Sequence, residues 1–297
     1  MAYRMVSGWT MTRAQLEDAL QRERFVACAA SQEKSVGWVE PRGQAHGALV
    51  EVVDGQWMLK LMIEVKAVPA SVVKRKVQER VEQIQASTGR KPGKKEIRDL
   101  RDEVRLTLVP MAFGKQSSVL VWLDPKTQLL VLDAASQVKA DEALTCLVKA
   151  TDALSVELLS PRTSASAAMS GWLSSREPPA GFSVDRECEL RAGDASQAVV
   201  RYTRHALDTD EVRQHIALGK LPTRLAMTWN GRVSFVLTDA MQIRRLAFLD
   251  VELEGAAAAP ADRVDDGFDA DTAIATAELR QLIPELLAAL GGEMAPG

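Results

Sequence analysis

The residue types that most often carry enzyme chemistry are few in this 297-residue chain, and they lie far apart. The three histidines, His46, His205 and His215, have no ligand partner three or four residues away, and no Cys-x-x-Cys pair occurs. No Gly-x-Ser-x-Gly motif surrounds a serine. The sequence therefore predicts no catalytic residue, no metal site and no cofactor, and we expect a protein that is not an enzyme.

Two segments imitate known sites without keeping their spacing. Residues 89–95 (GRKPGKK) resemble a phosphate-binding P-loop, but they are one residue short and carry Lys where a Mg²⁺-binding Ser or Thr must stand. The five aspartates within residues 262–271 lack the alternating spacing and the closing Glu of a calcium-binding EF-hand loop. We interpret the first segment as a solvated turn and the second as an acidic loop that caps a helix.

Positive charge is the one concentrated chemical feature of the chain. From Lys66 to Arg105, twelve Lys and Arg residues outnumber six Asp and Glu residues, a local net charge of +6 in a chain of net charge −3. Residues 250–297 are the opposite, with eleven acids and two arginines, a net charge of −9. Because salt screens charges beyond about 8–10 Å, each patch acts locally. The basic stretch therefore suits contact with phosphate groups.

Two amphipathic helices joined by a turn should position these cations. One apolar stripe is formed, at helical spacing, by Val73, Val77, Val81 and Ile84. Two glycines and a proline within residues 87–93 predict a break. A second stripe then runs through Ile97, Leu100, Val104 and Leu108, and Pro110 ends the helix. A cationic row on one side of this second helix is predicted for Lys94, Arg98, Arg101 and Arg105.

The pattern alone leaves two interpretations of the basic hairpin equally open. A solvated charged helix pair is common, and Glu79 and Glu82 interrupt the cations of the first helix. A phosphate-tracking surface is favoured by the aligned cations and by the additional charges of the turn. No aromatic residues are interleaved there, so stacking on single-stranded bases is not indicated. Contact with the backbone of a duplex, without reading its bases, fits these residue types better.

The rest of the chain predicts an α+β fold of antiparallel hairpins and helices. Strands are indicated at residues 56–65, 118–123, 128–133, 197–202 and 243–248, and Asn230-Gly231 joins two further strands in a hairpin. Residues 160–175 are small and polar and suggest a boundary. Residues 255–260 suggest an alanine-rich linker, and a final helix should span residues 272–290, capped by Asp269 or Asp271 and kinked by Pro284.

Composition fits a globular protein of the cytoplasm. Hydrophobic residues make up 46% and charged residues 26% of the chain. No apolar run approaches the roughly 18 residues of a membrane span, and the N-terminus lacks the pattern of a signal peptide. Cys28, Cys146 and Cys188 are scattered and odd in number, so we expect reduced thiols.

Motifs along nearly the whole chain resemble the recombination-associated RdgC proteins of proteobacteria. They begin with SQ-x4-GWV-x-P at residues 31–41, the basic hairpin, and DEV-x4-VP-x-AF at residues 102–113. VWLD at residues 121–124, DAAS at 133–136 and GK-x3-RLAM-x-W at 219–229 follow in the same order. The end of the chain adds FDAD at residues 268–271, AELRQLI at 277–283 and LGGE at 290–293.

The resemblance implies a ring-shaped homodimer with a basic central hole that encircles duplex DNA with little sequence preference. Such a protein would limit RecA-dependent recombination by competing for DNA in the nucleoid. Its partners would be duplex DNA, with single-stranded DNA left open, and a second copy of the chain, with RecA recombinase as a functional antagonist and no membrane. The alternative from the residues is an interaction protein whose basic finger docks an acidic protein surface.

The resemblance also suggests an organisation and a site. We expect a discontinuous central α+β domain (residues 1–68 and 114–160), a basic helical finger at the tip (69–113), and a second α+β domain (161–297) with the acidic C-terminal region. DNA contacts are expected from Lys74, Arg75, Lys76, Arg80, Arg90, Lys91, Lys94, Lys95, Arg98, Arg101, Arg105, Lys115, Arg201 and Arg204. Phe113 and His205 are expected at the dimer interface or on DNA, although core packing is an equal alternative for Phe113. At Arg204 and His205 the resemblance would lead us to expect Lys and Gln.

Overall fold

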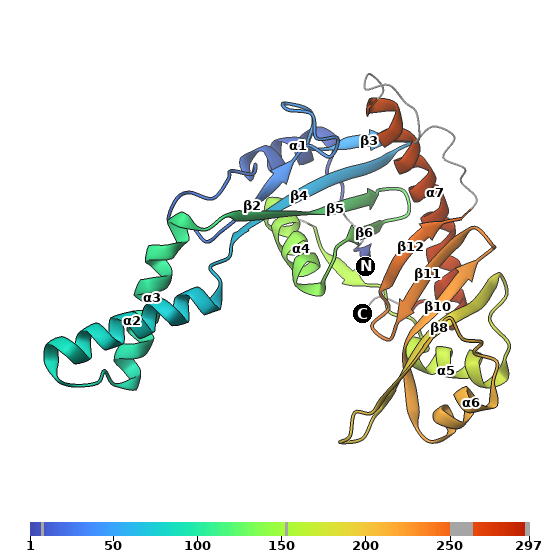
Figure 1. Ribbon diagram of the computed structural model, residues 1–297. Coiled ribbons are helices and arrows are strands. Elements are labelled where there is room, and N and C mark those ends of the chain that lie inside the picture. Colours follow the sequence, from blue (N-terminus) through green and yellow to red (C-terminus); the bar gives the residue numbers. More distant parts are fainter. Residues whose placement is uncertain (7–8, 152–153, 250–263, 295–297) are drawn as a thin grey trace.

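The computed structural model describes residues 1–6, 9–151, 154–249 and 264–294 (Figure 1). Within these residues, seven α-helices and twelve strands form an α+β fold with two antiparallel sheets. The larger sheet has seven strands and the smaller has five. The α+β expectation is therefore confirmed.

The seven-stranded sheet has the order β2-β4-β5-β6-β1-β7, with β3 also pairing with β4. Helices α1 (Arg13–Arg22) and α4 (Gln137–Thr151) pack against it. Along β4 and β5 the alternate residues, such as Leu59, Leu61 and Val121, point into this core, as the two-residue period of a strand requires. The strands are β1 (Ala2–Met5), β2 (Lys34–Val39), β3 (Glu51–Val53), β4 (Gln56–Lys66), β5 (Gly114–Asp124), β6 (Leu129–Asp133) and β7 (Val156–Leu158).

The five-stranded sheet has the order β12-β11-β10-β8-β9 and packs against α5 (Ala165–Ser175) and α6 (Asp210–Ala217). The predicted Asn230-Gly231 hairpin is present, and both residues have positive φ, 48° and 68°, as a tight two-residue turn requires. The strands are β8 (Phe182–Ala192), β9 (Val199–Thr203), β10 (Lys220–Trp229), β11 (Val233–Thr238) and β12 (Ile243–Phe248).

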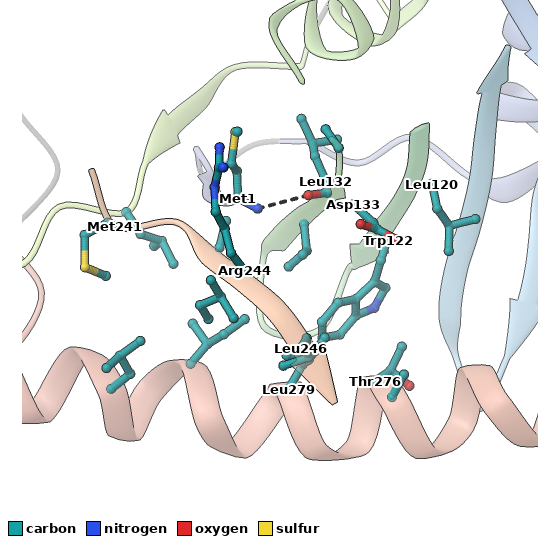
Figure 2. Close-up of a pocket in the computed structure, with 18 of the residues that line it drawn as sticks. Met1, Leu120, Trp122, Leu132, Asp133, Met241, Arg244, Leu246, Thr276 and Leu279 are labelled. Atoms are coloured by element: carbon teal, nitrogen blue, oxygen red, sulfur yellow. Dashed lines mark hydrogen bonds between the residues drawn. The ribbon is translucent and has the colours of Figure 1, made fainter. Parts of the chain in front are cut away.

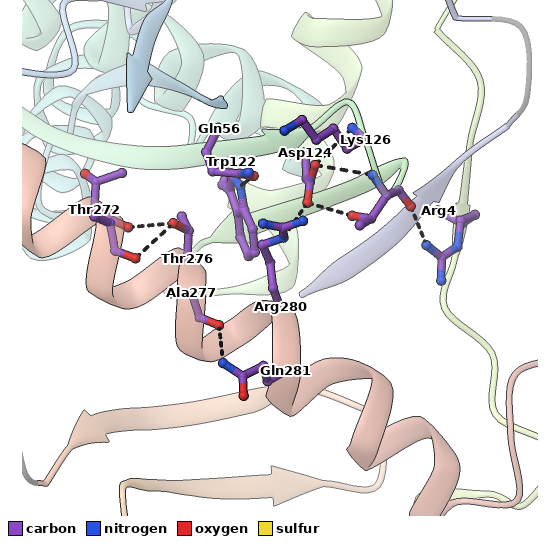
Figure 3. A network of polar contacts seen from close by, with 12 residues as sticks. Arg4, Gln56, Trp122, Asp124, Lys126, Thr272, Thr276, Ala277, Arg280 and Gln281 are labelled. Atoms are coloured by element: carbon purple, nitrogen blue, oxygen red, sulfur yellow. Dashed lines mark hydrogen bonds and ion pairs between the residues drawn. The ribbon is translucent and has the colours of Figure 1, made fainter. Parts of the chain in front are cut away.

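Helix α7 (Val264–Ala289) packs against both sheets. One of its faces places Leu282 and Leu286 in the core of the five-stranded sheet, and Leu290, directly after the helix, continues this face. The adjacent face places Ile283 and Leu287 against residues of the seven-stranded sheet. Polar contacts reinforce this junction, including an ion pair between Arg280 and the buried Asp124 at the end of β5 (Figure 3). The helix therefore sets the position of one sheet relative to the other.

Helices α2 (Ala70–Thr88) and α3 (Lys94–Leu108) pack against each other and extend away from the body (Figure 1), and we call residues 69–113 the finger. Gly89 ends α2 with a φ of 72°, a conformation that suits glycine. The finger and the five-stranded sheet extend from opposite ends of the seven-stranded sheet toward the same side, so the chain forms an open arch. The buried core of the finger consists of Val73, Val77, Val81 and Val104.

Two sequence predictions about this architecture are wrong. Helix α7 begins at Val264 rather than at residue 272, so Asp269 and Asp271 lie inside it and are not caps. A distant contact accounts for the extra turns, because the Arg42 guanidinium lies 4.7 Å from the ring centre of Phe268 and bonds Asp269. Residues 160–175 are not merely a boundary, since Ser164 caps α5 there. The predicted linker at 255–260, and Asp262, lie outside the described residues.

Candidate nucleic-acid interface

All the Lys and Arg residues of the finger that we predicted to contact DNA are exposed, but only some of them form ion pairs within the chain. Arg75 and Lys76 both approach the carboxylate of Glu79, at 3.8 and 2.8 Å. Ion pairs at 2.7–2.8 Å also join Arg90 to Glu96 and Arg105 to Glu33. These four cations are already partly neutralised within the chain, so they have less to offer to a phosphate group.

The other predicted cations of the finger, together with Lys115 at the start of β5, have no carboxylate within 4.0 Å among the residues that the structure describes. Each keeps its full charge and its donors for an external anion, which is the property that a phosphate contact requires. We call this set the free cations: Lys74, Arg80, Lys91, Lys94, Lys95, Arg98, Arg101 and Lys115.

Helix α3 separates its charges by side. At 3.6 residues per turn, Lys94, Arg98 and Arg101 share one flank of the helix, next to its apolar stripe. The carboxylates of Glu96, Asp99 and Glu103 follow the other flank, whereas Asp102, four residues after Arg98, lies at the edge of the cationic flank. An approaching polyanion is therefore attracted to one side of α3 and repelled from the other. The separation of charges therefore determines which side of α3 faces a polyanion, which the net charge of the helix alone would not do.

The turn at the tip of the finger is held by one carboxylate. Glu96 accepts two hydrogen bonds from the Arg90 guanidinium, at 2.7 and 2.8 Å, and one from the backbone N–H of Gly93 at 2.9 Å. The bonds from Arg90, followed by the one from Gly93, lower the pKa of Glu96 to about 2. Arg90 therefore serves the turn itself, while its neighbours Lys91 and Lys94 stay free.

Exposed apolar side chains gather where the finger returns to the body. Phe113 is 94% exposed, so the core-packing alternative for this residue is wrong. Met111 and Leu106 are exposed by 69% and 62%, and the sequence analysis missed both. A signal for Leu106 was available, because it lies off the apolar stripe of α3. Residues 114–119 of β5 add an open edge, since on that side β6 pairs only from Leu120 onward.

The predicted contacts on β9 lie at the other end of the chain from the finger (Figure 1). The Arg201 guanidinium is 2.7 Å from the carboxylate of Glu189, which also accepts from Thr223, and these bonds lower the pKa of Glu189. Arg204 and His205 are exposed in the loop that follows β9. Within one chain, the structure does not bring these residues together with the free cations.

Neither a metal cluster nor a membrane helix is found in the described parts of the chain. No group of three or more His, Cys, Asp or Glu side chains there could share a metal ion. None of the helices described is both long and apolar enough to cross a membrane. The three cysteines are free, with Cys188 buried and the other two half-buried.

Comparison with known proteins points to one family. A family described as "Putative exonuclease, RdgC" matches residues 1–293. The recombination-associated protein RdgC of Dechloromonas aromatica is 43% identical over 295 residues, which cover 98% of this chain and 96% of that one. This chain belongs to the RdgC family. RdgC proteins of Bordetella pertussis and Cupriavidus pinatubonensis are 41% and 43% identical over 291 residues, with the same coverage of 98% and 96%.

Membership of the RdgC family supports a role in recombination. The relatives are named for their association with that process, and their names state no enzymatic activity. The family description adds the word exonuclease, which the names of these relatives do not carry. The resemblance noted in the motifs is thus confirmed at the level of the family.

Proposed function

We propose that this protein binds duplex DNA without sequence preference, as a homodimer that encircles the duplex, and thereby limits RecA-dependent recombination. The observation that carries the proposal is the row of free cations on one flank of α3, exposed on a finger that extends from the body. Lys and Arg neutralise phosphates without reading bases, so affinity is expected to be electrostatic.

Two further features support encirclement by a dimer. The chain is an open arch, so a second copy could close it into a ring. Its two ends offer surfaces for such a contact: the exposed Phe113 beside the unpaired edge of β5, and the loop that carries Arg204 and His205. An unpaired strand edge next to an exposed aromatic side chain is a common site of association.

The test is the salt dependence of duplex binding. Each neutralised phosphate contributes about 0.9 to the slope of log K against log salt. We expect replacement of Lys94, Arg98 and Arg101 by Ala to lower this slope by about 2–3. The matched control replaces Arg75, Lys76 and Arg105 by Ala, which removes the same charge from ion-paired positions and should have a smaller effect. A flat salt response, or equal effects of the two triple variants, would show that the proposal is wrong.

Competition with RecA is testable with the same variants. If the protein only occupies DNA, the Lys94/Arg98/Arg101 variant should lose inhibition of RecA-promoted strand exchange in proportion to its lost affinity. Inhibition that survives in this variant would indicate direct contact with RecA. A fluorescent fusion should follow the nucleoid for the natural chain and spread through the cytoplasm for the variant.

The strong acidity of residues 250–297 favours a second candidate function. A net charge of −9 in the same chain could attract the basic finger of another copy, so the finger could dock a protein surface instead of DNA. Sedimentation of the purified protein separates the two functions. Association that weakens with salt and is lost in the triple variant, in a protein without DNA affinity, would favour protein docking.

A further inference from the structure

A cavity of about 640 Å³ lies where the two sheets and α7 meet (Figure 2). Its walls are predominantly apolar and come from parts of the chain that are far apart in sequence: β1, β4, β5 and β6 of the larger sheet, β12 of the smaller one, and α7. Side chains that form these walls include Trp122, Leu132, Ile243, Leu246, Leu279 and Ile283. A space of this size is within the range of roughly 300–1,000 Å³ that is usual for pockets that hold small molecules.

The charged side chains that line the cavity, those of Asp133, Arg244 and Arg245, are exposed and lie at its mouth. Arg244 donates through Nε to Gln242 at 3.0 Å, and no carboxylate pairs with it among the described residues. In Figure 2 its side chain extends beside Met1, whose ammonium group donates to the carbonyl oxygen of Leu132 at 2.9 Å. Arg245 is already paired, with Glu187. Asp133 is the only acid that lines the described part of the cavity, so the mouth remains cationic.

An irregularity in β12 places both arginines at this mouth. Consecutive residues of a regular strand point to opposite faces of the sheet, so only one of the two could line a cavity. Here the pairing of β12 with β11 shifts register between Ser234 and Val236, and Arg245 has a φ of 51°. Such a bulge redirects side chains locally. The cationic mouth is therefore a feature of the backbone, rather than a chance orientation of flexible side chains.

We propose that this cavity binds an amphiphile with a single apolar chain and an anionic head group, the chain among Trp122, Leu246 and Leu279 and the head on Arg244. An apolar interior offers nothing to a polar ligand, whereas each methylene that it buries raises affinity by up to about fourfold. The unpaired guanidinium supplies a charge-assisted hydrogen bond to a carboxylate or phosphate. This site is separate from the finger, and the inference does not depend on DNA binding.

Calorimetry with dodecanoate and the full chain, below the micelle concentration, tests the proposal. We expect saturable binding of one dodecanoate per chain, and a loss of up to about sixteenfold in affinity for decanoate, which is two methylenes shorter. Arg244→Gln should weaken dodecanoate binding by about fivefold and leave the binding of neutral dodecanol unchanged. The control, Arg186→Gln, changes an exposed arginine of the same sheet and should alter neither. Dodecyl phosphate distinguishes a phosphate head from a carboxylate.

Two cavity-filling variants locate the binding. Leu279→Trp should lower the affinity for both dodecanoate and dodecanol by at least about tenfold, and Leu246→Trp serves if the first variant does not fold. Absence of saturable dodecanoate binding would overturn the proposal. So would binding that survives whichever of these variants folds, or equally tight binding of dodecyltrimethylammonium. If no dodecanoate binds and the filled variant sediments differently, the cavity is a contact between copies of the chain and the proposal is wrong.

Discussion

The carboxylate of Asp124, completely buried at the end of β5, lies 2.9 Å from Nε of Arg280 on α7 (Figure 3). The same carboxylate accepts hydrogen bonds from the backbone N–H groups of Lys126 and Thr127 and from the Thr127 hydroxyl. It therefore both shapes the β5–β6 turn and links that turn to the helix between the sheets. Two pieces of structure more than 150 residues apart depend on one side chain.

Removal of Arg280 should therefore destabilise the protein. Loss of one partner from a buried ion pair costs about 3–5 kcal/mol. Because Asp124 keeps three other donors and Arg280 is partly exposed, we expect Arg280→Ala to lower the free energy of unfolding by about 2–3 kcal/mol. The neighbouring exposed Gln281 provides the control, and Gln281→Ala should change the free energy of unfolding by less than about 0.5 kcal/mol. Urea unfolding of the three proteins measures this, and equal values for the two variants would contradict the assignment.

Release of a paired cation should strengthen DNA binding. Glu79 engages Arg75 and Lys76, and the hydrogen bond from Lys76 is the main cause of its lowered pKa. Glu79→Gln keeps the size of the side chain and frees both cations, so duplex affinity at low salt should rise by about two- to fivefold. Gln78→Glu, the reverse change at the preceding position, should lower it. Fluorescence anisotropy with a labelled duplex measures both, and an unchanged affinity in Glu79→Gln would argue against contact on this side of α2.

The finger should open without the rest of the chain. The four buried residues of its apolar core, Val73, Val77, Val81 and Val104, belong to α2 and α3, so loss of their packing should remain local. We expect Val77→Ala to lower the stability of the finger by about 1–2 kcal/mol. Hydrogen exchange should then accelerate in α2 and α3, while the amides of β4 and β10 stay protected. Exchange that accelerates throughout the chain would show that the finger and the body unfold together.

Phe113 should contribute to association rather than to folding. Because its side chain is 94% exposed, Phe113→Asp should leave the free energy of unfolding within about 0.5 kcal/mol of its original value. The dissociation constant of the proposed dimer should nevertheless rise, because a charge at an apolar contact opposes association. Val138 on α4 is a similarly exposed apolar residue, 74% accessible, and Val138→Asp is the control. Sedimentation velocity measures association, and an equal change in association for both variants would show that Phe113 does not lie at the interface.

The turn at the tip of the finger should respond to acid in a defined window. The pKa of Glu96 falls from an ordinary 4.5 to about 2 in the folded chain. A lowered carboxyl pKa means that the stabilising contribution is fully present above about pH 4.5 and is lost as pH falls toward 2. The side-chain carboxyl resonance of Glu96 should therefore titrate near pH 2. In Arg90→Ala the midpoint should rise toward 4.5, and an unshifted midpoint would show that Arg90 does not hold the turn.

Local patterns predicted the finger well, because its determinants are close together in sequence. The apolar stripes of Val77 and Val104 and the break at residues 87–93 require no distant partner. Strand β8 was missed and α5 was mistaken for a boundary, since each is stabilised by β10, which lies 28 or more residues away in sequence. The early start of α7 depends on Arg42 in the same way.

The sequence predicted which residue types form the candidate site, but not which of its cations are unpaired and can contact a phosphate group. Helical spacing indicated the cationic row of α3 and, with it, the position of Arg105. The partner of Arg105 is Glu33, 72 residues away, so no local pattern could show that this cation is paired whereas Arg101 is free. Whether the two ends of the arch contact those of another chain likewise depends on the shape of the folded surface, which the spacing of residues in the sequence does not predict.

The self-contained packing of α2 and α3 has a consequence for the reach of the finger. Since no buried residue of the body completes that core, the two helices can lengthen together without changes elsewhere. Seven residues added to each helix would extend the finger by about 10 Å while they preserve the facing of its apolar stripes. If two such arches enclose DNA, the length of residues 70–108 determines the width of the opening. Insertion of seven residues in each helix of the finger would then widen it.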